Sequence, residues 1–334
     1  MKILTAASNK KWIDTSAASG AVQSDEQKKL ETEFRQHLVD VLMANNLIVF
    51  TGLGSSLSIN KKTPKAAPSM SDLWDAVKGK VTDVHLKLII GKVKYQTAAT
   101  GDNIEMLLSR CQAAEKYSTD KDVKKFIEDT EKTIVDKCNF VTNTLNLDYH
   151  ESFLRKIARR SVNKPRLKLF TTNYDLLFEE AARRNKVTII DGFSNTEPRE
   201  FDGGYFNYDL VKREKSTDNL ELISNLFHLY KVHGSMDWEQ NGSTIIKTKN
   251  PSKPLIIYPR DTKYELSYDQ PFLEMMARFQ SSLREPNSSL LIIGFGFNDI
   301  HLSEPVLSAI KSNISLKVLI VDPRLEVSNN SYLV

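Results

Sequence analysis

Short apolar runs and segments of helical periodicity alternate along most of this chain. Continuous apolar runs bounded by turn residues are typical of strands buried on both faces of a sheet, whereas apolar residues three or four positions apart indicate amphipathic helices. We interpret as strands the runs at 47–50, 167–170, 187–190, 226–232, 243–248, 255–258, 290–293 and 316–321. The helices predicted around them cover 24–46, 176–185, 271–283 and 304–311. Strands that alternate with helices predict an α/β fold with a doubly wound, mostly parallel sheet covered on both faces.

The first helix has a recognisable start. Ser24 and Gln27 form the S-x-x-Q pattern of a capping box, in which each side chain accepts a hydrogen bond from the backbone of the other residue. The apolar residues that follow at helical spacing, before Asn45 and Asn46, are Leu30, Phe34, Leu38, Val41 and Leu42. Residues 1–21 are small and polar, and we predict that they form a poorly ordered N-terminal arm.

Residues 60–165 interrupt the alternation with a stretch that has almost no strand signal. Helical periodicity occurs in it at 71–77, 103–116, 123–138 and 151–160. Lysines alternate there with acidic residues, which is typical of a solvated helix surface. We therefore predict an arm at 1–21, an α/β core formed by 22–59 and 166–334, and a helical insertion at 60–165. Residues 193–222 are predicted to be a long loop, and such loops in compact domains are more often functional than idle.

Composition and charge narrow the functional class only modestly. The 334 residues carry a net charge of +4, which is too dilute to predict direct nucleic-acid binding. Two cysteines, Cys111 and Cys138, exclude a disulfide framework and a four-thiolate zinc site within one chain. The sequence lacks an apolar run of signal-peptide or membrane-spanning length, so we expect a soluble protein of the cytoplasm.

Polar and glycine-rich segments follow directly after four of the predicted strands. Ligands of doubly wound sheets bind beyond the carboxyl ends of the strands, close to the point where the strand order reverses. The four segments are Gly52-Leu53-Gly54-Ser55-Ser56, Thr171-Thr172-Asn173-Tyr174-Asp175, Lys231-Val232-His233-Gly234-Ser235 and Gly294-Phe295-Gly296-Phe297-Asn298-Asp299. Their expected convergence on one edge is more informative than any one of them, and it predicts a nucleotide site there.

The glycines after the first strand allow two interpretations. Gly52 and Gly54 would let the backbone approach a diphosphate, and Ser55 and Ser56 would donate hydrogen bonds at a helix start. The dinucleotide fingerprint GxGxxG is incomplete, since its third glycine position is Leu57, and GxxxxGK[ST] is absent. An ordinary tight turn is the alternative.

Three polar residues at strand ends have both a functional and a structural interpretation. The Asn173 amide offers a donor and an acceptor, which suits ribose hydroxyls or an attacking water, but it would equally satisfy the backbone of a turn. Asp175 would contact the nucleotide or cap the next helix. Asp322 ends the last strand, where an acid accepts hydrogen bonds from ribose, yet Asp322-Pro323 is also a plain start of a turn.

Of the six histidines, only His233 ends a predicted core strand and precedes a glycine. An imidazole titrates near neutrality, so His233 is the candidate general base. A nucleophilic pair with Ser235 is disfavoured because the G-x-S-x-G elbow is missing. Metal binding is weaker still: no HExxH or CxxC spacing exists, and Asp299 with His301 is only an i, i+2 pair. His150 falls in the helical insertion, where a surface or packing role is expected.

Taken together, these strand-end motifs resemble the sirtuin-like NAD-hydrolysing domains of bacterial anti-phage defence. The similar segments follow the family's order over most of residues 47–322: FTGLGSS, GDNIEMLLS, LFTTNYDLLFEEA, LYKVHGSMDW, LIIYPR and LLIIGFGFNDIHL. TTNYD, K-x-HGS-x-DW and GFGFNDxH are specific in combination. The stretch IDGFSNTEPREFDGGYF and the helix PFLEMMARF are most similar to the variety that is paired with a HerA-type hexameric ATPase.

The resemblance implies a Rossmann-like sirtuin core that takes NAD as its substrate, without a metal, and cleaves the nicotinamide–ribose bond. By the family pattern, Asn173 would hold the nicotinamide ribose and the attacking water, and His233 would be the catalytic base. Gly52, Gly54 and Ser55 would contact the diphosphate, whereas Gly294 and Gly296 would make room for the adenosine. These five residues, together with Thr172, Asp175 and Asp322, are the candidate NAD-binding residues.

Two differences from the family pattern affect the expected function. Leu53 stands where relatives often carry a small residue. The zinc ribbon of protein-deacylating sirtuins is absent, because two cysteines cannot supply CxxC…CxxC, and this favours hydrolysis.

The leading hypothesis is therefore an NAD glycohydrolase effector that depletes cellular NAD. The alternatives are an NAD-dependent deacylase or ADP-ribosyltransferase, and a nucleotide-binding module that docks on an ATPase without turnover. We expect a homo-oligomer in a bacterial cytoplasm, with a HerA-type ATPase as a further partner and no membrane or nucleic acid bound by this chain.

Overall fold

The computed structural model describes residues 2–4, 12–15, 23–63, 65–96, 102–214, 219–258, 269–323 and 325. Most of the predicted arm at 1–21, and Arg260 of the LIIYPR segment, lie outside these residues. The described part of the arm forms a short antiparallel pair, β1 (Lys2–Ile3) with β2 (Ile13–Asp14), which the sequence pattern did not predict. Within the described ranges, every helix is too short or too polar to span a bilayer.

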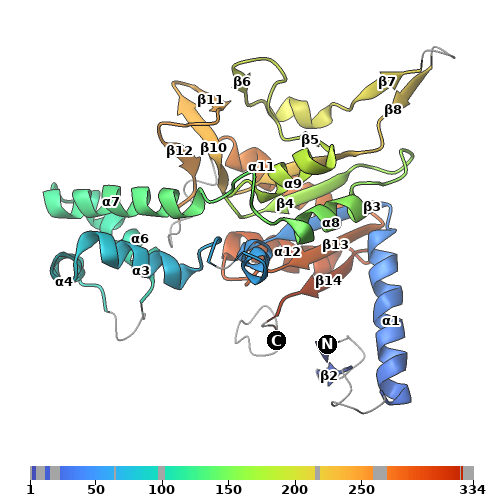
Figure 1. Ribbon diagram of the computed structural model, residues 1–334, viewed down its shortest axis with the longest axis horizontal. Coiled ribbons are helices and arrows are strands. Elements are labelled where there is room, and N and C mark those ends of the chain that lie inside the picture. Colours follow the sequence, from blue (N-terminus) through green and yellow to red (C-terminus); the bar gives the residue numbers. More distant parts are fainter. Residues whose placement is uncertain are drawn as a thin grey trace.

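A sheet of six parallel strands, in the order β14-β13-β3-β4-β9-β5, forms the centre of the fold (Figure 1). The strands are β3 (Asn46–Thr51), β4 (Leu167–Thr171), β5 (Thr188–Ile190), β9 (Leu226–Lys231), β13 (Ser288–Ile293) and β14 (Lys317–Val321). All six coincide with predicted apolar runs, and the predicted doubly wound α/β fold is confirmed. The runs are continuously apolar because both faces are covered: Ile48, Val49 and Phe50 are each 0 % exposed.

Alternate residues of β3 contact the two helical layers of the core. Ile48 and Phe50 belong to the cluster that contains residues of α11 (Phe272–Arg284) and α12 (Ile300–Ser312). Leu47 and Val49 belong to the opposite cluster, with residues of α8 (Asp148–Ile157) and α9 (Leu177–Asn185). This alternation is the two-residue period of a strand, so each helical layer covers one apolar face of the sheet.

The first long helix, α1 (Asp25–Leu42), begins at the predicted capping box. The Ser24 amide donates to Gln27 Oε1 at 2.9 Å, and the Gln27 amide donates to Ser24 Oγ at 3.2 Å. The helix ends earlier than the pattern indicated, because Asn46 already belongs to β3.

The described residues between β3 and β4 are helical, as predicted, and contain no strand. The helices before α8 are α2 (Leu53–Leu57), the 3₁₀ turn η1 (Ser58–Lys61), α3 (Met70–Val81), α4 (Asp83–Lys92), α6 (Ile104–Glu115) and α7 (Lys121–Cys138). Helices α3, α4, α6 and α7 share a hydrophobic cluster that also includes Met236, Ile256 and Tyr258, and they form a lobe beside the sheet (Figure 1). Helix α8 instead packs on the central sheet with α9. The predicted domain boundaries at 59 and 165 stay predictions.

A small antiparallel sheet, in the order β12-β10-β11-β6, adjoins the central one. Its strands are β6 (Arg199–Glu200), β10 (Gly234–Asn241), β11 (Thr244–Lys247) and β12 (Pro254–Ile256). The sequence pattern missed β10 because it is polar; its Ser235 and Asp237 are buried by pairing with other polar groups.

The prediction of one long loop at 193–222 was wrong. Besides β6, this stretch holds a 3₁₀ turn, η2 (Gly203–Asn207), and a hairpin of β7 (Val211–Arg213) with β8 (Leu220–Leu222). The strands are too short to show a periodicity of their own; β6 is defined by its pairing with the distant β11, and β7 and β8 by their pairing with each other.

Candidate functional site

The four predicted segments gather at the carboxyl edge of the sheet. Thr51 at the end of β3 is paired with Ile293 of β13 on one side and with Thr171 of β4 on the other. Thr171 in turn is paired with Lys231 of β9. The chain proceeds from β3 towards β4, whereas β13 joins the other side of β3, so the strand order reverses here. Doubly wound folds bind their ligands in the crevice at such a reversal.

The glycines of the first and last segments pack against each other. A Cβ built on Gly54 would lie 2.6 Å from Gly294 Cα, and one on Gly52 would lie 2.8 Å from the Gly294 carbonyl oxygen. Gly294 also has a φ of +62°, which side-chain-bearing residues rarely adopt. The Gly54 amide donates to Gly294 O at 2.9 Å and the Gly52 amide to Ile293 O at 3.1 Å. Close approach of two loops thus explains these glycines, and both amides are engaged within the protein.

Other candidate NAD-binding residues lie at the same edge in looser surroundings. A Cβ on Gly296 would meet nothing closer than Asn298 Nδ2 at 3.4 Å, so no steric need for glycine exists there. Thr172 is half-buried, and its amide donates to Thr51 O at 3.0 Å. Asp322 follows β14, which is separated from β3 by β13.

Asn173 lies just beyond β4, and its side-chain amide is anchored on the glycine turn. Its Nδ2 lies 2.9 Å from the Gly52 carbonyl oxygen, 3.0 Å from Ser55 Oγ and 2.7 Å from Ser56 Oγ. The Gly52 carbonyl can only accept, so this contact fixes which end of the amide is the nitrogen. Within the described part of the chain no group donates to Asn173 Oδ1, although the residue is only 9 % exposed. The amide oxygen is therefore held in place and is available as an acceptor.

Asp175 and Lys231 form hydrogen bonds that hold the turn at 171–175, which contains Asn173. Ser56 Oγ donates to Asp175 Oδ2 at 2.5 Å, and Asp175 Oδ1 accepts from the amide of Leu177 at the start of α9. The N-cap residue of α9 is Leu176, so the N-cap role weighed for Asp175 was wrong; the Asp175 carboxylate instead closes the turn just before the helix.

The buried Lys231 Nζ donates to the carbonyl oxygens of Tyr174 and Asp175 and to Glu179 Oε1. Burial raises the pKa of Glu179, and the nearby Lys231 cation opposes that rise. The lysine therefore ties the backbone of the TTNYD turn to α9.

His233 and His301 form a buried pair of imidazoles. Their Nε2 atoms lie 3.1 Å apart, and the two residues are 3 % and 8 % exposed. His233 lies two residues beyond the end of β9, whereas His301 lies in the first turn of α12. A hydrogen bond between two Nε2 atoms needs one protonated and one unprotonated nitrogen, so the tautomer of one histidine constrains that of the other.

The polar residues after His233 have partners of their own. Ser235 Oγ donates to Asp237 Oδ1 at 2.5 Å. Lys247 lies 3.3 Å from Asp237 and 2.6 Å from Asp191, which also contacts Arg199 at 3.0 Å. Burial would raise the pKa of Asp191, but the two cations outweigh it and hold this pKa below its ordinary value. The network fixes the small sheet to the end of β5.

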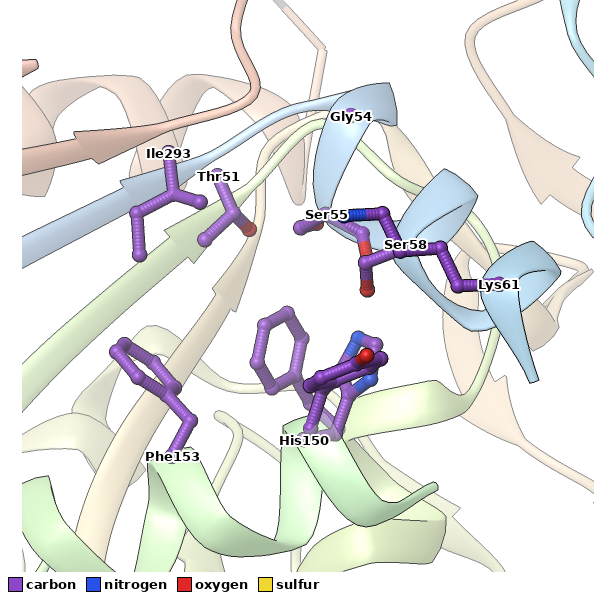
Figure 2. A pocket seen from close by; sticks show the side chains of 10 residues that line it. Thr51, Gly54, Ser55, Ser58, Lys61, His150, Phe153 and Ile293 are labelled. Carbon is purple, nitrogen blue, oxygen red and sulfur yellow. The ribbon is translucent and has the colours of Figure 1, made fainter. Parts of the chain in front are cut away.

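A pocket of about 270 Å³ lies between the glycine turn and α8 (Figure 2). Ser55, Ser58 and Lys61 line one side, and His150 and Phe153 of α8 line the other. We call it the His150 pocket. Asn173 and His233 are not among its lining residues.

His150 is 4 % exposed, and neither of its ring nitrogens has a hydrogen-bond partner in the described part of the protein. Burial lowers the pKa of His150, against the opposing effect of Asp175, so this imidazole is neutral near pH 7.

Sequence reasoning missed three residues of this region. His301 was weighed only as a metal ligand beside Asp299, and no group of three potential metal-ligating side chains exists among the described residues. Lys231 is the only lysine or arginine in β9, a fully buried strand, and that irregularity is the signal that could have found it. His150 was expected to have a surface or packing role in the insertion; it packs against Phe178 of the central core, but no role at a pocket was predicted for it.

The family comparison agrees with this geometry. Residues 167–331 match the SIR2-like domain, and this span contains β4, Asn173, His233, His301 and β14. This part of the chain is therefore similar to a SIR2-like domain on a Rossmann-like sheet, and domains of this kind bind NAD and are often NAD-utilising enzymes. The glycine turn after β3 precedes the matched span and is joined to it by the contacts of Asn173 and Gly294. No curated protein matches the chain significantly.

Proposed function

We propose that this protein is an NAD glycohydrolase, which cleaves NAD to nicotinamide and ADP-ribose. The observation that carries the proposal is that the anchored amide of Asn173 and the imidazole of His233 follow two adjacent strands of the sheet. Both residues lie two positions beyond the paired Thr171 and Lys231, at the ends of adjacent strands. The SIR2-like domain at 167–331 makes NAD the expected substrate.

Hydrolysis at this site needs a positioned water and a group that takes its proton. The Asn173 Oδ1 acceptor would hold a ribose hydroxyl or the water, since Nδ2 is committed to the glycine turn. The water oxygen bonds to ribose C1′, the bond from C1′ to the nicotinamide nitrogen breaks, and its electron pair leaves with nicotinamide. His233 takes the proton that the water loses. The rate of such a reaction depends mainly on positioning the water and on stabilising the positive charge that develops on the ribose, rather than on a strong nucleophile.

The residues present fit NAD in part. An amide oxygen and an imidazole suit a ribose and a water. The Gly52 and Gly54 amides, however, already donate to carbonyl groups of the β13 end, so the proposed diphosphate contact needs other donors. Ser55 is likewise engaged, since its hydroxyl donates to Gly52 O at 2.8 Å. The contribution of these residues is to hold the Asn173 amide.

His301 would act on the reaction through His233. A neutral His233 can take a proton only at an unprotonated nitrogen, and the contact with His301 Nε2 couples that choice to the tautomer of His301. We assign His301 as a positioning residue for the base.

A nicotinamide-release assay tests the activity. Purified protein is incubated with NAD, and free nicotinamide is measured for the wild type, Asn173→Ala and His233→Ala. Asn143→Ala, an exposed asparagine outside the site, is the matched control. We expect losses of about 10²-fold or more for the two site variants and no change for the control. Equal release by all four proteins would reject the site.

The same assay separates the alternatives. NAD binding without nicotinamide release, in the complete assembly with its partner, would favour the nucleotide-binding module. Release that depends on an added acyl-lysine peptide would favour the deacylase. Release that depends on an acceptor protein, which then carries ADP-ribose, would favour the transferase.

We further propose that the protein acts in anti-phage defence in the bacterial cytoplasm, as a homo-oligomer with a HerA-type ATPase. This rests on the resemblance of its motifs. Co-expression with such an ATPase, followed by light scattering and by measurement of cellular NAD during infection, tests it. We expect a stable complex and a decrease in cellular NAD that does not occur with Asn173→Ala. A monomer that does not bind the ATPase, with a constant level of NAD during infection, would refute the proposal.

A further inference from the structure

The helical lobe carries an apolar surface that is exposed to solvent. Helix α4 lies at the end of the lobe that points away from the central sheet (Figure 1). Its Leu86 and Ile89 are buried in the hydrophobic cluster of the lobe, whereas Val84 and Leu88 are 82 % and 46 % exposed. Val84 and Leu88 are four positions apart, so they lie on one face of the helix. Scattered exposed apolar residues are ordinary, but a group of them on one face is typical of a contact surface.

A neighbouring turn extends this surface beyond α4 itself. Lys92 of α4 forms ion pairs with Asp120 at 2.8 Å and with Asp122 at 2.6 Å. These contacts place the turn between α6 and α7 beside the end of α4, and this turn carries Tyr117, which is 91 % exposed. Gly91 lies one turn further along the exposed face of α4, and a Cβ on it would meet nothing within 4 Å. The backbone of a second helix can therefore approach α4 closely there.

The same surface is positively charged. Residues 77–94 contain five lysines and one aspartate, a net charge of +4 that equals the net charge of the whole chain. Two of these lysines are paired with aspartates. The other three, which are exposed and form no ion pair with any described residue, are Lys80, Lys87 and Lys94. We call Val84, Leu88 and Tyr117, together with these three lysines, the α4 face.

The combination of apolar and basic groups specifies what covers the α4 face. A nucleic-acid backbone would pair with the lysines but would bring phosphates against Val84 and Leu88. A lipid surface binds helices that have a long apolar stripe, and α4 has ten residues, of which two are exposed and aliphatic. An amphipathic helix with acidic residues beside its apolar stripe satisfies both kinds of group, because it buries the aliphatic side chains and complements the charge.

We propose that the α4 face is a docking surface for an acidic amphipathic helix of a partner protein. The apolar stripe of that helix would pack on Val84 and Leu88, and its carboxylates would lie near Lys87. The buried side of α4 belongs to the cluster against which Tyr174 packs, and Tyr174 directly follows Asn173. A docked partner is thereby connected with the turn at 171–175. This connection rests on the proposed function, whereas docking itself does not.

A synthetic helix tests docking directly. The probe is a fluorescein-labelled peptide of leucine, alanine and glutamate, about 18 residues long so that it forms a helix. Its leucines recur at i, i+3, i+4 and i+7, with glutamates on both sides of this stripe. Fluorescence anisotropy is followed as the purified full-length protein is added at low ionic strength. We expect a Kd of about 100 μM or below, which should rise as salt screens the charges. The same peptide with lysine in place of each glutamate should not bind.

Matched variants locate the peptide on the protein. Val84→Ser combined with Leu88→Ser removes the exposed aliphatic groups and should weaken binding about tenfold. Lys87→Glu replaces an attraction by a repulsion and should weaken binding about threefold to tenfold. Leu220→Ser and Lys29→Glu make the same kinds of change at exposed positions of β8 and α1, and should leave binding unchanged. Thermal melting confirms that each variant is folded.

Each contrary result overturns the proposal in a distinguishable way. No rise in anisotropy at about 0.5 mM protein would reject helix docking. Unchanged affinity in both α4 variants would place the peptide on another surface, and equal binding of the lysine peptide would show that charge does not select the partner. Tighter binding to vesicles of phosphatidylcholine with phosphatidylglycerol, or to a short DNA duplex, that is lost in Lys87→Glu would assign the face to a phosphate-bearing partner. All these measurements are independent of nicotinamide release, so the proposed function is tested separately.

Discussion

The Nε2 atoms of His233 and His301 face each other at 3.1 Å, although the two residues are 68 positions apart in the sequence. His233 lies two residues beyond a strand of the central sheet, and His301 lies in the first turn of a helix of the layer beside it. The contact makes the protonation of the candidate base depend on a residue that does not itself end a strand.

Replacing His301 is expected to separate positioning from substrate binding. His301→Phe keeps the ring but removes the contact with His233, and should lower kcat about tenfold with little change in KM, the effect of losing one hydrogen bond. His301→Gln retains a hydrogen-bonding group and should recover most of the loss. Steady-state nicotinamide release gives both constants, and His37→Phe is the control. A change in KM alone would contradict the positioning role.

The glycines of the GFGFND segment should respond differently to one added methyl group. Gly294→Ala places a Cβ 2.6 Å from Gly54 Cα at a φ of +62°, so we expect a loss of more than about 1 kcal/mol of unfolding free energy. Gly296→Ala meets nothing closer than 3.4 Å and should change this free energy by less than about 0.5 kcal/mol. Urea denaturation measures both. Equal effects would show that the packing of the two loops is not what requires glycine.

Removing the buried charge of Lys231 should destabilise the protein because it leaves Glu179 without its cation. Lys231→Met is expected to lower the unfolding free energy by about 3–5 kcal/mol. The double variant Lys231→Met with Glu179→Leu should be more stable than the single one, since both charges are then gone.

The exposed pair of Lys212 with Glu221 provides the control for this experiment. Lys212→Met should change the free energy by about 0–1 kcal/mol. The single variant Glu179→Leu completes the comparison. If the loss of unfolding free energy in the double variant equalled the sum of the losses in the two single variants, the ion pair would not contribute to stability.

The stability of the protein should fall on mild acidification, in part because of His228. Burial lowers the pKa of this histidine to about 4. Between pH 6.5, near its ordinary pKa, and about pH 4, the unfolded chain binds a proton that the folded one does not. The unfolding free energy therefore decreases as the pH is lowered through this range. The full difference amounts to about 3 kcal/mol.

His228→Gln should flatten this slope, as urea denaturation between about pH 6.5 and pH 4 would measure. His150, whose pKa burial also lowers, contributes in the same direction, so the comparison with wild type isolates the His228 share. A variant with the wild-type slope would disprove the assignment.

Much of the site could be predicted because strand ends are visible in the sequence. A run such as Leu47–Phe50 is apolar throughout only when both faces of a parallel sheet are covered, so its end marks the binding edge. Asn173 and His233 were found in this way. Strand β10 escaped prediction because its buried Ser235 and Asp237 are satisfied by side chains, which removes the hydrophobic signal.

The sequence by itself determined the six strands of the central sheet and the edge at which the four polar segments gather, and it singled out Asn173 and His233 as candidates. The tertiary structure alone decided that His301 faces His233, that Gly54 touches Gly294, and that His150 lies unpaired beside a pocket. The reason is physical: periodicity reports what one segment buries, whereas these contacts join segments far apart in the chain, and only the packing of the whole sheet and its helices brings them together.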